Sequence, residues 1–156
     1  FGVNFFGHSP DFVIEAVQQQ MEQGISLGIQ SNLAAETAAL VSQLGKVERV
    51  AFSNTGPEAI MGAVRIVRSR TKRQKIVIFA GSYHGTFDGI LARSGEESTV
   101  APPLSLGTPS GMTEEVMVLS YGVEESLEII AAQGDQLAAV LVEPVQSRKP
   151  DLQPQE

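Results

Sequence analysis

The chain contains no cysteine and only two histidines among its 156 residues. Without cysteine it can form neither a disulfide framework nor a thiolate metal site, so a disulfide-stabilised extracellular scaffold is excluded. Two histidines fall short of the ligand sets that common zinc sites use, and we expect no metal centre.

Long hydrophobic runs are also missing. No stretch approaches the ~20 apolar residues of a membrane-spanning helix, and no secretory signal peptide is visible. Basic residues are outnumbered, with 11 Lys and Arg against 18 Asp and Glu and a net charge of −7. An acidic chain favours neither nucleic acid nor an anionic membrane as a partner. We therefore expect a globular, cytoplasmic protein without these partners.

Apolar periodicity predicts helices that alternate with strands. The first helix is expected from the Ser9-Pro10-Asp11 start to Gly24, and the others over residues 33–44, 57–70 and 124–132. The strands are expected over residues 50–53, 75–80, 115–119 and 137–142. A long loop is expected over residues 94–114. We expect Ser9 to cap the first helix and Gly45 to close the second. This alternation predicts an α/β fold with a mostly parallel sheet and flanking helices.

Three of the expected strands end in polar or glycine-rich turns, with the sequences SNTGP, AGSYHG and VEPVQ. Ligands of parallel α/β sheets bind at the carboxyl ends of the strands. The three turns can therefore converge on one edge of the sheet and form a site.

The turn Ser53–Pro57 has two interpretations. A glycine turn before a helix exposes backbone N–H groups to an anion, and hydroxyls of Ser53 and Thr55 could add donors for a phosphate monoester. The alternative is a capped helix without a ligand, opened by Pro57. The turn is neither a P-loop nor a dinucleotide fingerprint, because it lacks both G-K-[ST] and G-x-G-x-x-G.

The other two turns also have two interpretations each. The Tyr83 ring could stack on a flat aromatic ligand with His84 beside it, or both could serve the turn alone. Glu143 ends a buried apolar strand, where an unpaired carboxylate would be unfavourable. It is therefore either hydrogen-bonded for structural reasons or faces a polar cavity.

Taken together and in order, four segments resemble the class III, pyridoxal-phosphate-dependent aminotransferases of fold type I. They are GHSP, FSNTGPEAIMGAVRIVR, KIVIFAGSYHG and AAVLVEPVQ, and the resemblance spans essentially the whole chain. Glutamate-1-semialdehyde aminomutases are the branch that the segments resemble most. FGVNFFGHSP, IFAGSYHGTFDGILAR and EPVQSRKPDLQP also resemble aminotransferase domains of cyanobacterial hybrid peptide synthetase–polyketide synthases of the microcystin and nodularin type.

The resemblance implies a pyridoxal 5'-phosphate site. It places the cofactor phosphate at Thr55, Gly56 and Pro57, where the family commonly has threonine in place of Pro57. It places Tyr83 on the pyridine ring with His84 beside it, and Glu143 near the far side of the ring. Phe1 falls where the aminomutases have a substrate-side aromatic residue, and Gln146-Ser147-Arg148 replaces their Ala-Gly-Asn.

The family also needs an aspartate at the pyridinium nitrogen and a lysine that binds the cofactor covalently. The matching motifs fall beyond Glu156, so we expect residues 1–156 to be the N-terminal portion of one aminotransferase domain and inactive alone. The resemblance implies an amino-acid donor, a β-keto acyl acceptor bound to an acyl carrier protein, and a homodimer. The alternatives are a free-standing aminomutase, a non-catalytic phosphate-binding module, and a docking fragment of a megasynthase.

Overall fold

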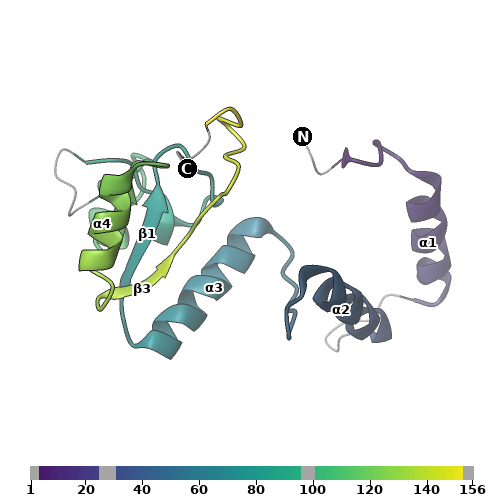
Figure 1. Ribbon diagram of the computed structural model, residues 1–156. Coiled ribbons are helices and arrows are strands. Elements are labelled where there is room, and N and C mark those ends of the chain that lie inside the picture. The colour runs from purple at the N-terminus through teal and green to yellow at the C-terminus, as the bar shows by residue number, and fades with distance from the viewer. Residues whose placement is uncertain (1–3, 25–30, 96–100, 153–156) are drawn as a thin grey trace. The chain divides into compact units, whose positions relative to one another are not determined.

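A computed structural model describes residues 4–24, 31–95 and 101–152 (Figure 1). The chain divides into two compact units, Phe1–Ala51 and Phe52–Glu156. No helix of the described residues is both long and apolar enough to cross a membrane.

The first unit consists of two helices, α1 (Asp11–Glu22) and α2 (Asn32–Gly45). The expected Ser9 cap is wrong, because Pro10 is the extended residue before α1 and no side chain caps the helix. The expected Gly45 stop is also wrong by one residue. Gly45 is still helical, and Lys46 takes the left-handed conformation with φ 52°.

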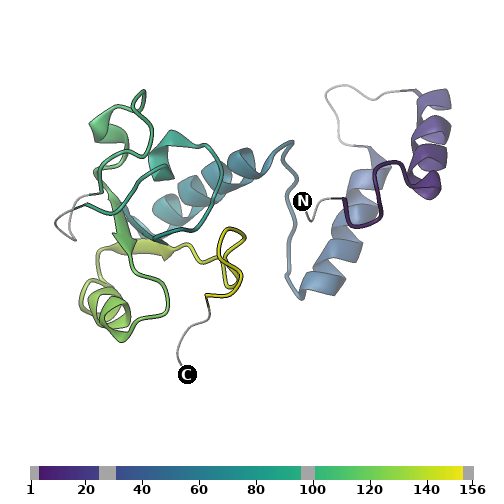
Figure 2. The same ribbon diagram turned by 90° about the horizontal axis from the view of Figure 1, so that it is seen from above.

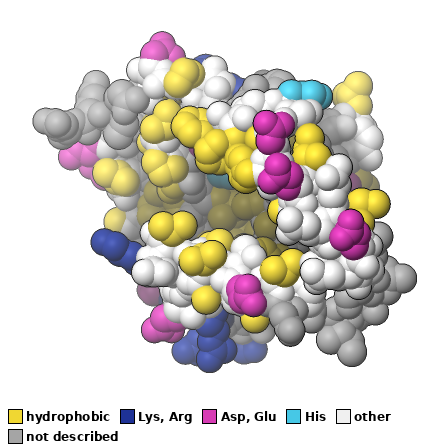
Figure 3. All heavy atoms as spheres, turned by 90° about the vertical axis from the view of Figure 1, so that its right-hand side faces the viewer, with side chains coloured by type: hydrophobic (Ala, Val, Ile, Leu, Met, Phe, Trp, Pro, Cys, Tyr) yellow, Lys and Arg dark blue, Asp and Glu magenta, His cyan; other side chains and the backbone are white. Residues whose placement is uncertain are grey.

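The apolar side chains expected on these two helices are present but exposed, and no residue of α1 is buried. The large exposed ones are Phe12, Val13, Ile14, Val17 and Met21 in α1, and Leu33, Leu40, Val41 and Leu44 in α2. Figure 3 shows hydrophobic side chains (yellow) spread over one face of the molecule. The described residues of the first unit therefore form no buried core that could stabilise its helices.

The strand expected over residues 50–53 is not formed. These residues pair with no strand of the described chain, and Phe52 is half-exposed. A short apolar run becomes a strand only where a partner strand satisfies its backbone groups.

The second unit contains a three-stranded parallel sheet in the order β2-β1-β3. The strands are β1 (Lys75–Phe79), β2 (Val116–Leu119) and β3 (Leu137–Val140), each close to its expected range. The sheet confirms the predicted α/β class with a parallel sheet and flanking helices.

Helices α3 (Gly56–Thr71) and α4 (Glu124–Ala132) cover opposite faces of the sheet (Figures 1 and 2). Side chains of β1 alternate between the faces, as a strand requires. Ile76 and Ile78 pack in the cluster with Val64 of α3, whereas Val77 and Phe79 pack in the cluster that α4 covers. This two-sided burial explains why the strand is continuously apolar.

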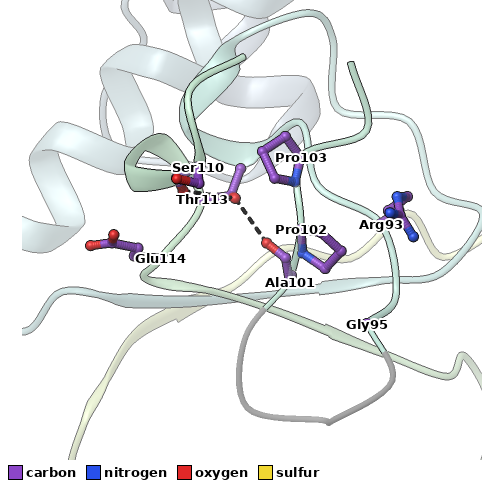
Figure 4. Close-up of a pocket in the computed structure, with 8 residues that line it drawn as sticks. All are labelled: Arg93, Gly95, Ala101, Pro102, Pro103, Ser110, Thr113 and Glu114. Carbon is purple, nitrogen blue, oxygen red and sulfur yellow. Dashed lines mark hydrogen bonds between the residues drawn. The ribbon is translucent and has the colours of Figure 1, made fainter. Parts of the chain in front are cut away.

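The long loop expected over 94–114 contains some order where it is described. A short 3₁₀ helix, η3 (Ser110–Met112), follows η2 (Asp88–Ile90), and Ala92 pairs with Pro103 in an isolated antiparallel bridge. The buried Thr113 hydroxyl donates to the Ala101 carbonyl over 2.8 Å, and both residues line a pocket (Figure 4). These contacts tie separate parts of the loop region to one another.

Candidate functional site at the carboxyl edge of the sheet

The first wall of the site is the N-terminus of α3. Thr55 caps the helix, and its hydroxyl accepts from the Glu58 N–H over 3.3 Å while Glu58 Oε2 accepts from the Thr55 N–H over 2.9 Å. This reciprocal capping box satisfies two helix-end donors. No described residue accepts from the Gly56 N–H, and the Thr55 hydroxyl hydrogen is still available to donate. The helix end thus offers two donors to an anion.

The second wall, the turn after β1, packs directly against the first. Gly85 has a left-handed φ of 91°, and a Cβ placed on it would lie 2.7 Å from Pro57 Cγ. Only glycine fits this approach without displacing the Pro57 ring. The contact joins the SNTGP and AGSYHG turns.

Glu143, after β3, joins the third turn to the second. Its Oε2 accepts from the Tyr83 N–H over 3.1 Å, and its Oε1 accepts from the Ser147 N–H over 2.9 Å. Burial alone would raise the pKa of Glu143, but these hydrogen bonds and the nearby His84 outweigh burial and lower it. The carboxylate is therefore held charged as a bridge between two turns.

Gln146 makes a second tie between these turns. It is completely buried, and its Nε2 donates to the Ala80 carbonyl and to the Ser82 hydroxyl, each over 3.1 Å. A Cβ on Gly81, which has φ 87°, would lie 2.9 Å from Gln146 Oε1. The close approach leaves room only for glycine.

Tyr121, which follows β2, joins the end of that strand to the same network. Its hydroxyl donates to the Pro144 carbonyl over 2.7 Å, and its ring meets Phe79 edge-on with centroids 5.5 Å apart. The ends of β1 and β2 are therefore both tied to the segment that follows Glu143, which itself comes after β3.

The Tyr83 side chain projects from this tied network and is 46% exposed. The guanidinium carbon of Arg148 lies 4.9 Å from the centre of its ring, a cation–π distance. One ring face of Tyr83 is thus covered by Arg148.

His84 carries a buried Nε2 that has no partner among the described residues. Burial lowers the pKa of His84, and the charge of Glu143 only partly opposes this effect. A buried polar atom without a partner is unfavourable, so Nε2 is available to a ligand.

Most of the expected site residues therefore come together. Thr55, Gly56 and Pro57 meet the turn of Tyr83 and His84, and that turn meets Glu143. Ser53 is exposed and makes no hydrogen bond with a described residue. Phe1 lies outside the described residues.

Three contributors were not expected from the sequence: Glu58, Gln146 and Tyr121. The T-x-x-E spacing of Thr55 and Glu58 is a capping-box pattern that could have identified Glu58. Gln146 and Tyr121 give no local signal, because each acts on a segment distant in sequence. The described residues contain no group of three or more acidic or histidine side chains that could hold a metal ion.

Comparison with known proteins decides the family. The family described as aminotransferase class-III matches residues 1–155. The chain belongs to this family. Its relatives include a glutamate-1-semialdehyde 2,1-aminomutase of Methanothermobacter thermautotrophicus, 37% identical over 147 residues that make up 93% of this chain and 35% of the relative. Another, from Desulforudis audaxviator, is 40% identical over 93% of this chain and 34% of the relative.

Solved transaminase structures share the fold. A "Transaminase with PLP bound" superposes with a TM-score of 0.83 at 32% identity, covering 95% of this chain and 35% of that one. A β-phenylalanine aminotransferase from Variovorax paradoxus gives a TM-score of 0.73 at 30% identity, over 92% of this chain and 31% of that one. The chain spans about a third of the length of these relatives.

Proposed function

We propose that the tied turns bind pyridoxal 5'-phosphate and that the chain forms the cofactor-binding part of a transaminating enzyme. The convergence of three features carries the proposal. A helix end with free donors, a half-exposed tyrosine ring and a buried unpaired imidazole nitrogen lie at one sheet edge. They match the phosphate, the flat ring and the polar ring substituents of this cofactor.

The phosphate would be held at the first turn of α3. The Gly56 N–H and the Thr55 hydroxyl would donate, and the helix dipole would favour the negative charge. Pro57 supplies no N–H, and Glu58 places a carboxylate beside the same helix end. Both features weaken anion binding relative to a helix end without them.

The ring would be held by the second and third turns. Tyr83 would stack on it, and His84, kept neutral by burial, would hydrogen-bond a polar group of the cofactor through Nε2. Glu143 would act by fixing the Tyr83 turn while its negative charge lies near the ring. When bound, pyridoxal phosphate supplies an electron sink that lets an amino group pass from one substrate to another.

We further propose that residues 1–156 are the N-terminal portion of one aminotransferase domain. A chain about a third as long as its relatives supports this. The remainder would supply the lysine and the aspartate of the family, and the whole domain would form a homodimer.

For the full protein we propose amino transfer from an amino acid to a β-keto acyl chain on an acyl carrier protein, in peptide–polyketide biosynthesis. The support is the likeness of three segments to such domains, together with a structural neighbour whose name specifies a β-amino acid, β-phenylalanine. A second candidate is the glutamate-1-semialdehyde aminomutase reaction, which the names of the curated relatives favour. A non-catalytic phosphate-binding module is the third.

A cofactor titration followed by two substrate assays tests these proposals. The full-length protein, stripped of cofactor, is titrated with pyridoxal phosphate by absorbance, and saturable binding is expected. The loaded protein is then offered an amino acid with a β-keto acyl thioester, or glutamate-1-semialdehyde alone. Product from the first substrate set supports the carrier-bound acceptor, and product from the second replaces it with the aminomutase reaction. Absence of cofactor binding overturns the proposal.

A further inference from the structure

Arg148 has a contact that the network of the three turns does not need. Its guanidinium lies over the Tyr83 ring, 4.9 Å from the centroid. Among the described residues, Arg148 has no carboxylate within ion-pair distance. Glu143 is close in sequence, but its two oxygens accept from the Tyr83 and Ser147 N–H groups. The ring is therefore the partner of Arg148.

The segment that carries Arg148 is itself held in place. The preceding Ser147 N–H donates to Glu143, and the following Lys149 N–H donates to the Gln146 carbonyl over 3.0 Å. Gln146 is buried and tied to the turn after β1. The backbone segments that carry the Tyr83 ring and the Arg148 guanidinium are thus held in one hydrogen-bonded network. Because both segments are already fixed, less conformational entropy is lost when the two side chains stack.

We propose that Arg148 is a positioning residue that covers one face of Tyr83 and leaves the opposite face for the flat ligand. This inference rests on the proposed cofactor site. A phenol ring has two faces, and a guanidinium is planar and stacks on one of them. With its ring fixed in this way, Tyr83 presents a prearranged surface to the cofactor. The energy of an exposed cation–π contact limits the effect of this positioning on affinity to about two- to five-fold.

A second arrangement, with Arg148 on the ring face that the cofactor uses, predicts the opposite change in affinity. If Arg148 occupied the face that the cofactor needs, it would have to leave on binding, and its removal would tighten binding. The sign of the affinity change therefore decides between a support and a competitor.

The test uses the full-length protein and its dissociation constant for pyridoxal phosphate. Arg148→Ala is expected to weaken binding about two- to five-fold, and Arg148→Lys to restore part of the loss. Lys149→Ala removes the same charge from the neighbouring position without a ring contact, and is expected to leave the affinity unchanged. In a Tyr83→Ala background, Arg148→Ala should have no further effect, because Arg148 acts through the ring.

A measurement without cofactor checks the contact itself. Fluorotyrosine is incorporated, and the fluorine NMR signal of Tyr83 is assigned as the one that is lost in Tyr83→Phe. This signal should shift in Arg148→Ala and stay in place in Lys149→Ala. Equal affinities of Arg148→Ala and the wild type, tighter binding, or additive losses in the double variant would overturn the positioning role while leaving the cofactor site intact. A wild type that does not bind pyridoxal phosphate would overturn both.

Discussion

Gly85 lies so close to Pro57 that a Cβ on the glycine would come within 2.7 Å of the proline ring. This contact joins the turn after β1 to the first turn of α3. It places the Tyr83 turn beside the helix end that is proposed to hold the phosphate. The close packing of the two turns, which leaves no room for a side chain at residue 85, therefore shapes the site together with its polar groups.

Gly85→Ala is expected to lower both stability and cofactor affinity. Alanine in a left-handed conformation costs about 1–2 kcal/mol, and the clash with Pro57 separates the two turns. Thermal unfolding and cofactor titration measure the two effects. The matched control is Gly62→Ala in α3, where a Cβ would meet nothing within 4 Å; it should raise stability by about 0.5–1 kcal/mol and leave affinity unchanged. Unchanged behaviour of Gly85→Ala would contradict the packing account.

Pro57→Ala is expected to tighten phosphate binding several-fold, because it restores a backbone N–H at the helix end. Pro57→Thr adds a hydroxyl as well and should bind more tightly still. The dissociation constants of inorganic phosphate and pyridoxal phosphate, measured on the full-length protein, give the comparison. If both variants bind phosphate no better than the wild type, the phosphate does not lie at this helix end.

Substitutions in the capping box are expected to affect protein stability and phosphate binding differently. Thr55→Ala should destabilise the protein by about 1 kcal/mol and weaken phosphate binding, whereas Thr55→Ser should preserve both. Glu58→Gln keeps an acceptor for the Thr55 N–H but removes a negative charge. It is expected to tighten phosphate binding with little loss of stability. Weaker binding in Glu58→Gln would show that the carboxylate contributes to the site.

Acid should destabilise the protein in two steps. Burial depresses the pKa of His84 below its ordinary 6.5, so the unfolded state takes up a proton first, and stability falls as pH drops through and below this value. The lowered pKa of Glu143 adds a loss below the ordinary glutamate value of 4.5. Melting temperatures measured across this range should show both steps, and His84→Gln should abolish the first. His8→Gln, at an exposed position of the first unit, is the control and should retain it.

Local patterns predicted much of this fold. The apolar run of β1 and the periodicity of α4 gave ranges close to those observed, because β1 is buried and Ile129 and Ile130 of α4 pack against the cluster that the helix covers. The same reasoning failed at residues 50–53, since strand formation depends on a partner. The convergence of the turns after β1 and β3 followed from parallel topology. The turn Ser53–Pro57 follows no strand of the described chain and reaches the site through the packing of Pro57 against Gly85 instead.

The hydrogen bonds that connect the turns of the site could not be predicted from the sequence. Gln146 and Ala80 are 66 residues apart, and Tyr83 and Glu143 are 60 apart, so only the folded sheet brings them together. Arg148 was noticed as a departure from the aminomutases, but its contact with Tyr83 depends on how the Gln146 segment is anchored. Tertiary geometry, not residue type, determines these roles.

A crystal structure of the full-length protein with pyridoxal phosphate tests the central claim most directly. The account predicts the phosphate against the Gly56 N–H and the Thr55 hydroxyl, the pyridine ring on Tyr83, and a hydrogen bond to His84 Nε2. A cofactor bound elsewhere, with the first turn of α3 free of phosphate, would contradict it.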